Sequence, residues 1–217
     1  MKVIVAPSEK EIGKFIGIVQ AFPKIWHGDV LDVGCRSANL KRVLANKNIT
    51  YVGLDMNPPA DIICNLEHGI PVEDKRYDVV VALDVLEHTD NIYKAFDELC
   101  RVSRQYVLIT LPNLYEIKIR LRFLFGNKIS EKYGLPTIPP LDRHRWFFSL
   151  NEARQFCILQ VEKMSFEVKD EGVIIGPRRA MFIGKALVAS NPNLFATHYV
   201  VLIKRKPNSN VAFKSLQ

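Results

Sequence analysis

Residues 30–38 read Val-Leu-Asp-Val-Gly-Cys-Arg-Ser-Ala, and this stretch decides the fold of the chain. Three apolar residues surround one carboxylate, Asp32, and the run continues into Gly34 and a small residue, Cys35. A helix-compatible segment, residues 39–45, follows directly. The pattern predicts a buried strand that passes through a tight turn into the N-terminus of a helix, where backbone N–H groups can approach a ligand.

A second predicted strand, residues 49–54, is followed at once by Asp55. This acid comes about 20 residues after Gly34, at the end of the next strand, where a carboxylate is placed to accept both hydroxyl groups of a ribose. The two segments together predict a site for an adenosine-containing cofactor. A dinucleotide is disfavoured, because its G-x-G-x-x-G motif needs a second glycine where this chain has Arg36, and the third is also missing.

The composition fits one globular domain. With 217 residues, 48% of them hydrophobic and 24% charged, we expect a single domain over residues 1–206 and a flexible tail over 207–217. No apolar run reaches the roughly 18–20 residues of a membrane span. The four cysteines form no C-x-x-C pair, which favours reduced thiols and a cytoplasmic location, and we predict no metal ligands. The net charge of +7 permits an anionic partner without identifying one.

Strand and helix patterns alternate along the chain, which predicts an α/β fold with a doubly wound parallel sheet. Residues 77–83 form a continuous apolar run, typical of a strand buried on both faces. Residues 106–111 predict the next strand, and residues 198–204 the last one.

The alternation breaks over residues 113–147, where an amphipathic helix and a proline-rich loop lead into Arg143-His144-Arg145. An insertion at the carboxyl end of a strand lies over the ligand crevice of a doubly wound fold, so we expect it to form a lid over the acceptor site. A peripheral scaffold helix is the alternative.

One further motif identifies a family resemblance. Residues 77–88 end in Asp84-Val85-Leu86-Glu87-His88, and together with residues 32–35 and Asp55 they resemble, in order and spacing over residues 25–112, the motifs of class I S-adenosyl-L-methionine (SAM) methyltransferases. The resemblance implies a Rossmann-like seven-stranded sheet in three α/β/α layers, an antiparallel final hairpin, and SAM as cofactor. Residues 111–144 also resemble, more loosely, the MetW-like branch.

The resemblance implies roles for individual residues. The expected cofactor-binding residues are Asp32, Gly34, Cys35, Asp55, Met56, Asn65, Leu66 and Asp84. Asp55 would hold the ribose hydroxyls, Met56 would pack on adenine, and Asn65 would lie at the adenine amino edge. A structural carboxylate that holds the turn remains an alternative for Asp32, and a helix N-cap remains one for Asp55.

The glycine motif of the family is incomplete here, because Arg36 and Ala38 stand where it has its second and third glycines. We expect the Arg36 side chain to turn away from the cofactor while its backbone N–H stays in the turn, since a buried unpaired guanidinium would be too costly.

Methyl transfer from a sulfonium is an in-line displacement, so the enzyme chiefly has to align donor and acceptor. An oxygen acceptor also needs a base, and His88, His144 and Asp84 are the candidates. Both histidines have structural readings of equal weight. Arg143 and Arg145 favour an acidic acceptor, such as a carboxylate, a phosphate or a uronic sugar.

We therefore expect a SAM-dependent methyltransferase that acts on a small-molecule or glycan-precursor acceptor. The alternative is a SAM-fold protein that activates a partner enzyme with weak or no catalysis; Arg36, Ala38 and the MetW likeness support it, since that family is associated with methionine biosynthesis beside an acyltransferase. Nucleic-acid methylation rests only on the net charge and the basic insertion, and it is disfavoured because the chain has no aromatic-interleaved basic repeats.

Overall fold

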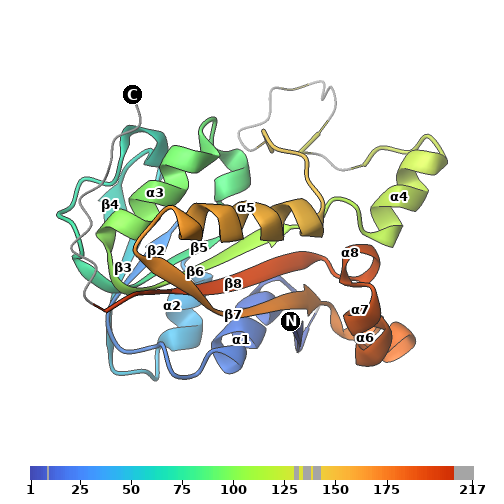
Figure 1. The fold of residues 1–217 in the computed structure, drawn as a ribbon, viewed down its shortest axis with the longest axis horizontal. Helices are drawn as coiled ribbons and strands as arrows, with labels where there is room; N and C mark the ends of the chain where they lie inside the picture. The colour runs from blue at the N-terminus through green and yellow to red at the C-terminus, as the bar shows by residue number, and fades with distance from the viewer. Residues whose placement is uncertain (9, 130–131, 134–137, 139–142, 208–217) are drawn as a thin grey trace.

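The apolar runs pair into one mixed sheet, shown in a computed structural model of the chain (Figure 1). The structure describes all residues except 9, 130–131, 134–137, 139–142 and 208–217, so nearly all of the predicted tail lies outside the described residues. Within the described part, the eight strands have the order β1-β7-β8-β6-β5-β2-β3-β4. They are β1 (Lys2–Val5), β2 (Gly28–Val33), β3 (Ile49–Asp55), β4 (Ile62–Ile63), β5 (Tyr77–Leu83), β6 (Ser103–Pro112), β7 (Phe166–Ile175) and β8 (His198–Arg205).

Helices cover both faces of this sheet, as the doubly wound prediction requires. They are α1 (Glu11–Ala21), α2 (Asn39–Leu44), α3 (Ile92–Val102), α4 (Ile117–Leu124), α5 (Leu150–Glu162), α6 (Pro177–Ile183), α7 (Lys185–Ser190) and α8 (Pro192–Phe195), with short 3-10 helices η1 (Leu66–His68) and η2 (Leu86–His88). Helices α1 and α2 lie on one face and α3 and α5 on the other (Figure 1). No helix in the described ranges is long and apolar enough to cross a membrane.

Seven of the strands form the sheet that the resemblance implies, including a final strand, β8, that runs antiparallel to both β6 and β7. The eighth, β1, adds to the edge and pairs in parallel with β7. Strand β1 was not predicted, because four residues are too few to show a strand periodicity. These residues become a strand because the edge of β7 is free to pair with them.

The sheet separates two hydrophobic cores, and β5 contributes to both. Val79 and Val81 pack with Ile18 of α1 and Leu40 of α2, whereas its alternate residues pack in the cluster that holds α3 and α5. All seven residues of β5 are buried. Because side chains of a strand alternate between faces, a strand covered on both faces has to be apolar throughout, which explains the continuous run that predicted it.

The insertion between β6 and α5 has two parts. Helix α4 has no buried residue and extends away from the sheet (Figure 1). The C-terminal end returns to the body of the protein, where the indole N–H of Trp146 donates to the Thr89 carbonyl at 2.7 Å and Phe148 packs against the core.

The turn after β2 keeps the backbone shape of a glycine motif without the second and third glycines of that motif. Gly34, Arg36 and Ala38 have φ values of 72°, 43° and 52°. The N–H groups of Gly34 and Cys35 both donate to the Leu54 carbonyl, at 2.7 and 3.1 Å, which ties the turn to the end of β3. Left-handed backbone costs a residue with a Cβ roughly 1–2 kcal/mol, so Arg36 and Ala38 hold this turn under strain.

Asp32 lies beneath the turn and is 3% exposed. Its carboxylate accepts a hydrogen bond from the Tyr51 hydroxyl at 2.7 Å. Burial raises the pKa of Asp32 to about 7, the Tyr51 hydrogen bond acts to lower it, and the negative charge of Asp55 acts to raise it. Because Tyr51 belongs to β3, this hydrogen bond from its hydroxyl links the two strands that carry the turn.

Replacing Ala38 with glycine relieves one strained position, and we expect Ala38→Gly to raise the free energy of unfolding by up to about 1 kcal/mol. The matched substitution Gly34→Ala should lower it by about 1–3 kcal/mol, because the φ is positive and the new Cβ would lie 2.5 Å from Cγ2 of Val85. Urea unfolding of both variants measures the difference. A destabilised Ala38→Gly protein would contradict the account of strain.

Asp32 should also make stability depend on pH. Between about pH 4 and its folded pKa of about 7, the folded protein holds a proton that the unfolded chain releases, so this carboxyl lowers stability as pH rises through that range. Asp32→Asn keeps the acceptor for Tyr51 and removes the titration. We expect its stability relative to the wild type to rise by about 1–4 kcal/mol from pH 4 to 7, measured by urea unfolding across pH. A pH-independent difference would show that Asp32 is ionised throughout.

Candidate functional site

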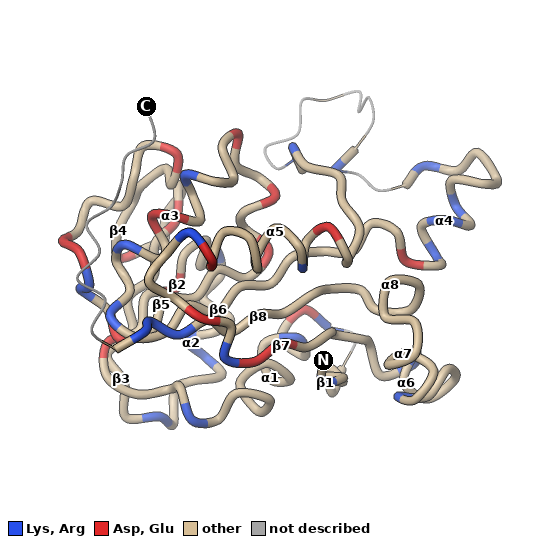
Figure 2. Tube along the Cα trace, viewed as in Figure 1, with Lys and Arg blue, Asp and Glu red and all other residues tan. Residues whose placement is uncertain are grey.

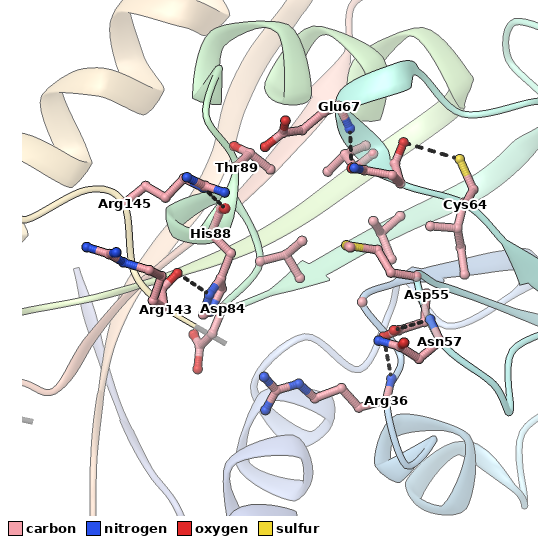
Figure 3. A pocket seen from close by; sticks show the side chains of 17 residues that line it. Arg36, Asp55, Asn57, Cys64, Glu67, Asp84, His88, Thr89, Arg143 and Arg145 are labelled. Carbon is pink, nitrogen blue, oxygen red and sulfur yellow. Dashed lines mark hydrogen bonds between the residues drawn. The ribbon is translucent and has the colours of Figure 1, made fainter. Parts of the chain in front are cut away.

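A cavity of about 470 Å³ opens where the carboxyl ends of β2, β3 and β5 meet (Figure 3). Ligands of open α/β sheets bind at this edge, outside the strand ends. Its lining includes nine of the predicted site residues, namely Gly34, Asp55, Met56, Asn65, Leu66, Asp84, His88, Arg143 and Arg145. The other three do not line it: Asp32 and Cys35 are buried behind the turn, and His144 lies behind His88 with a side chain 8% exposed.

Asp55 lies on the right-hand side of the cavity in Figure 3. One carboxylate oxygen accepts from the backbone N–H of Arg36 and the other from that of Asn57, both at 3.0 Å. Each carboxylate oxygen has a second acceptor position, so Asp55 can still receive two hydroxyl groups. It ends a strand and is followed by a turn, so the helix N-cap alternative does not apply.

The neighbours of Asp55 offer one apolar and one polar surface. Met56 is 61% exposed and lines the cavity, where an aromatic base can pack on it. The side-chain oxygen of Asn65 accepts the Glu67 N–H at 3.0 Å and so caps η1. Since an amide oxygen has two lone pairs, one remains for a ligand amino group.

Arg36 differs from the expectation in one respect. Its backbone N–H takes part in the turn by donating to Asp55. Its side chain, however, runs along the lower edge of the cavity toward the side that carries Asp84, and does not turn away (Figure 3). The guanidinium at this open edge remains hydrated, which avoids the cost of burial that motivated the expectation.

Asp84 lies opposite Asp55 and contacts two basic side chains. Its carboxylate pairs with Lys14 of α1 and with His198 of β8, the latter at 3.3 Å, and it accepts from the Thr110 hydroxyl at 2.6 Å. Burial acts to raise the pKa of Asp84, but His198 and Lys14 hold it well below its usual value. Asp84 is therefore a stable anion and a poor general base. Neither cationic partner was foreseen, because both come from distant elements.

His88 and the two arginines lie together on the Asp84 side (Figure 3). Nδ1 of His88 is 3.2 Å from the Arg143 carbonyl oxygen. Arg145 is held on three sides: its backbone N–H donates to the Glu87 carbonyl, its Nε donates to the His88 carbonyl, and its guanidinium pairs with Asp90 at 2.7 Å. Arg145 thus fixes the end of the insertion against η2.

Glu87 is a site residue that the sequence analysis did not single out. It is fully buried, and its Oε1 lies 3.8 Å from Nε2 of His88 and 3.9 Å from Nε2 of His144. Burial first, and then the negative charge of Asp84, raise the pKa of Glu87 well above its usual value, while the positive charges of Lys132 and Lys14 oppose that rise. The adjacent pair Glu87-His88 at the end of β5 was the only signal in the sequence.

Comparisons with known proteins agree with this architecture. A family model described as a methyltransferase domain matches residues 12–156, most of the chain. No curated protein gives a significant match.

Solved structures share the fold at low sequence identity. A SAM-dependent methyltransferase from Archaeoglobus fulgidus superposes with a TM-score of 0.60 at 15% identity, covering 90% of this chain and 95% of that one. Magnesium protoporphyrin IX methyltransferase (ChlM) from Synechocystis PCC 6803 with bound SAH gives 0.57 at 14%, covering 90% and 82%. The small RNA methyltransferase HEN1 gives 0.63 at 12%, covering 94% of this chain but 26% of that one.

The family match spans the glycine turn, Asp55, Asp84 and the strands from β2 to β6. The chain therefore belongs to the methyltransferase-domain family, and it is a class I methyltransferase with SAM as its cofactor.

Proposed function

We propose that SAM occupies the cavity with its ribose on Asp55 and its adenine between Met56 and Leu66, beside Asn65. Asp55 supports this placement because it retains acceptor capacity for two hydroxyl groups. The methionine part then extends past Gly34 toward Asp84, where the carboxylate is a stable anion that can attract the ammonium group.

The acceptor then approaches from the side of His88, Arg143 and Arg145. One observation carries this proposal: a single cavity has an acidic hydroxyl-binding end at Asp55 and an end bordered by two arginines and a histidine. Cationic side chains at the second end favour an anionic acceptor, such as a small molecule or glycan precursor with a carboxylate or phosphate. The chemistry we propose is methyl transfer to an oxygen of that acceptor, with residues 113–147 acting as a lid through their C-terminal end.

A nucleic-acid acceptor receives less support. Lys and Arg residues lie on several elements with Asp and Glu among them on most, and α4 carries basic residues without acids; along the trace they are not gathered into one continuous basic face (Figure 2). Direct sequence-independent binding to nucleic acid depends on such a face.

A role as an activator of a partner enzyme is the second candidate. It is favoured by α4 and the residue after it, where Phe123, Leu124 and Phe125 are each 73% exposed. A structural neighbour, also of low identity, comes from a complex between a putative methyltransferase and the Haloferax volcanii Trm112 methyltransferase activator, which supports a protein partner but does not by itself make this chain the activator. In that case the protein would bind SAM and a partner protein without methylating a small molecule.

Asp55 gives the direct test of the cofactor site. Asp55→Asn keeps the size of the side chain but loses its charge and one of its two acceptor oxygens, so we expect SAM affinity to fall by about 1–3 kcal/mol, or roughly 5- to 150-fold. Isothermal titration calorimetry with SAM measures it. The exposed Glu73→Gln is the matched control and should leave affinity unchanged. Equal affinity in a folded Asp55→Asn protein would refute the placement.

The acceptor class is tested by methyl transfer from radiolabelled SAM to hydroxylated carboxylates, hydroxylated phosphates and neutral alcohols. We expect transfer to anionic members only, and we expect Arg143→Ala to raise their KM about 10- to 100-fold while SAM affinity persists. Arg122→Ala on the exposed helix α4 removes the same charge outside the cavity and should change nothing. Preferred transfer to neutral alcohols would overturn the anionic acceptor, and SAM binding with no transfer would favour the activator.

A further inference from the structure

We propose that Glu87, His88 and His144 bind a divalent transition-metal ion, with zinc the best match to their donor atoms. The three residues come from η2 at the end of β5 and from the end of the insertion, so only the fold brings them together. One carboxylate oxygen and two imidazole nitrogens lie within 4.8 Å of one another. Two histidines and one carboxylate are a donor set that Zn²⁺ accepts at catalytic sites.

The distances suit one shared ion better than direct hydrogen bonds. Oε1 of Glu87 lies 3.8 and 3.9 Å from the two Nε2 atoms, beyond the reach of an N–H···O bond. Two donors that each lie about 2.1 Å from an ion are roughly 3.4 Å apart in tetrahedral geometry and at most about 4.2 Å apart. Because the three donor atoms lie within 4.8 Å of one another, a small inward movement of one histidine brings all three within reach of one ion.

The other ring nitrogens fix the imidazoles in the form that binds metals. Nδ1 of His88 faces the Arg143 carbonyl, which only accepts, so the hydrogen of that neutral ring is on Nδ1. Nδ1 of His144 lies 2.8 Å from the Tyr133 hydroxyl, which donates its own hydrogen to the Trp146 carbonyl. Nδ1 of His144 is therefore also the donor. In the neutral rings the lone pairs are then on the Nε2 atoms, which lie 3.8 and 3.9 Å from Oε1 of Glu87; outer contacts of this kind orient metal-binding histidines.

The carboxylate of Glu87 supplies the second, independent observation. Its side chain is fully buried, and neither oxygen accepts a hydrogen bond within the described part of the chain. A carboxyl group buried in this way is ionised only beside a positive charge or hydrogen-bond donors, because burying an unsatisfied anion costs several kcal/mol. A divalent cation between Glu87 and the two Nε2 atoms would supply that charge.

His88 lines the cavity and Glu87 and His144 lie behind it, so an ion bound by the three residues would lie beside the acceptor end of the cavity. Three protein ligands leave a zinc position for an oxygen of the acceptor, and zinc lowers the pKa of a bound hydroxyl or water. This catalytic consequence rests on the proposed function, whereas the metal site does not. In this proposal His88 and His144 are metal ligands, whereas the sequence alone suggested them as candidates for a general base.

Metal binding is tested on the full chain after dialysis against EDTA. We expect calorimetric titration with ZnCl₂ to show one zinc ion per chain, and Co²⁺ to give the visible spectrum of a nitrogen and oxygen site without a sulfur charge-transfer band. Glu87→Gln has the same shape and should weaken zinc binding at least about tenfold. His27→Ala removes an exposed histidine elsewhere and should leave zinc affinity unchanged.

A chain without stoichiometric zinc binding, or a folded Glu87→Gln protein with wild-type zinc affinity, would overturn the proposal. If Glu87→Gln does not fold, His88→Gln at the cavity wall serves as the second variant, with the same expectation. A sulfur charge-transfer band would place the ion on cysteines and also overturn it. SAM affinity is measured on the same samples: zinc binding without SAM binding would refute the proposed function and leave the metal site standing.

Discussion

The attachment of the glycine turn to the end of β3 is the constraint on which the site depends. Gly34 and Cys35 donate to the carbonyl of Leu54, and Arg36 donates to the carboxylate of Asp55. These bonds hold the loop after β2 open beside the acid at the end of β3. Without them, the parallel strands would still pair, but no cavity of this shape would separate Asp55 from Asp84.

Charge is then arranged around that cavity by elements from the whole chain. Helix α1 supplies Lys14 and β8 supplies His198, which together keep Asp84 ionised. Arg145 fastens the insertion to η2 through Asp90 and two backbone carbonyls. The anionic side of the cavity at Asp84 and its cationic border at Arg145 thus depend on contacts between distant segments.

The parts of this arrangement that the sequence predicts are those encoded locally. Strand β5 has its predicted bounds, because a strand covered on both faces has to be a continuous apolar run. Gly34 and Asp55 line the cavity as expected, since a strand end followed by a turn is a short-range signal. The seven-stranded sheet and its antiparallel last strand came from the resemblance.

The remaining features depend on tertiary contacts that no local pattern contains. Strand β1 exists because β7 offers an edge, and the burial of Glu87 follows from the return of the insertion over η2. The strained φ of Ala38 is equally invisible in the sequence, because alanine is a good helix former and suggests helical backbone there. Long-range packing decides each of these.

A crystal structure with S-adenosylhomocysteine would test the proposed orientation of the cofactor in the cavity. We expect both ribose hydroxyls within about 3.2 Å of the Asp55 carboxylate, adenine against Met56, and the sulfur toward Asp84 and His88. Density for the ligand outside this cavity, or a ribose remote from Asp55, would contradict it.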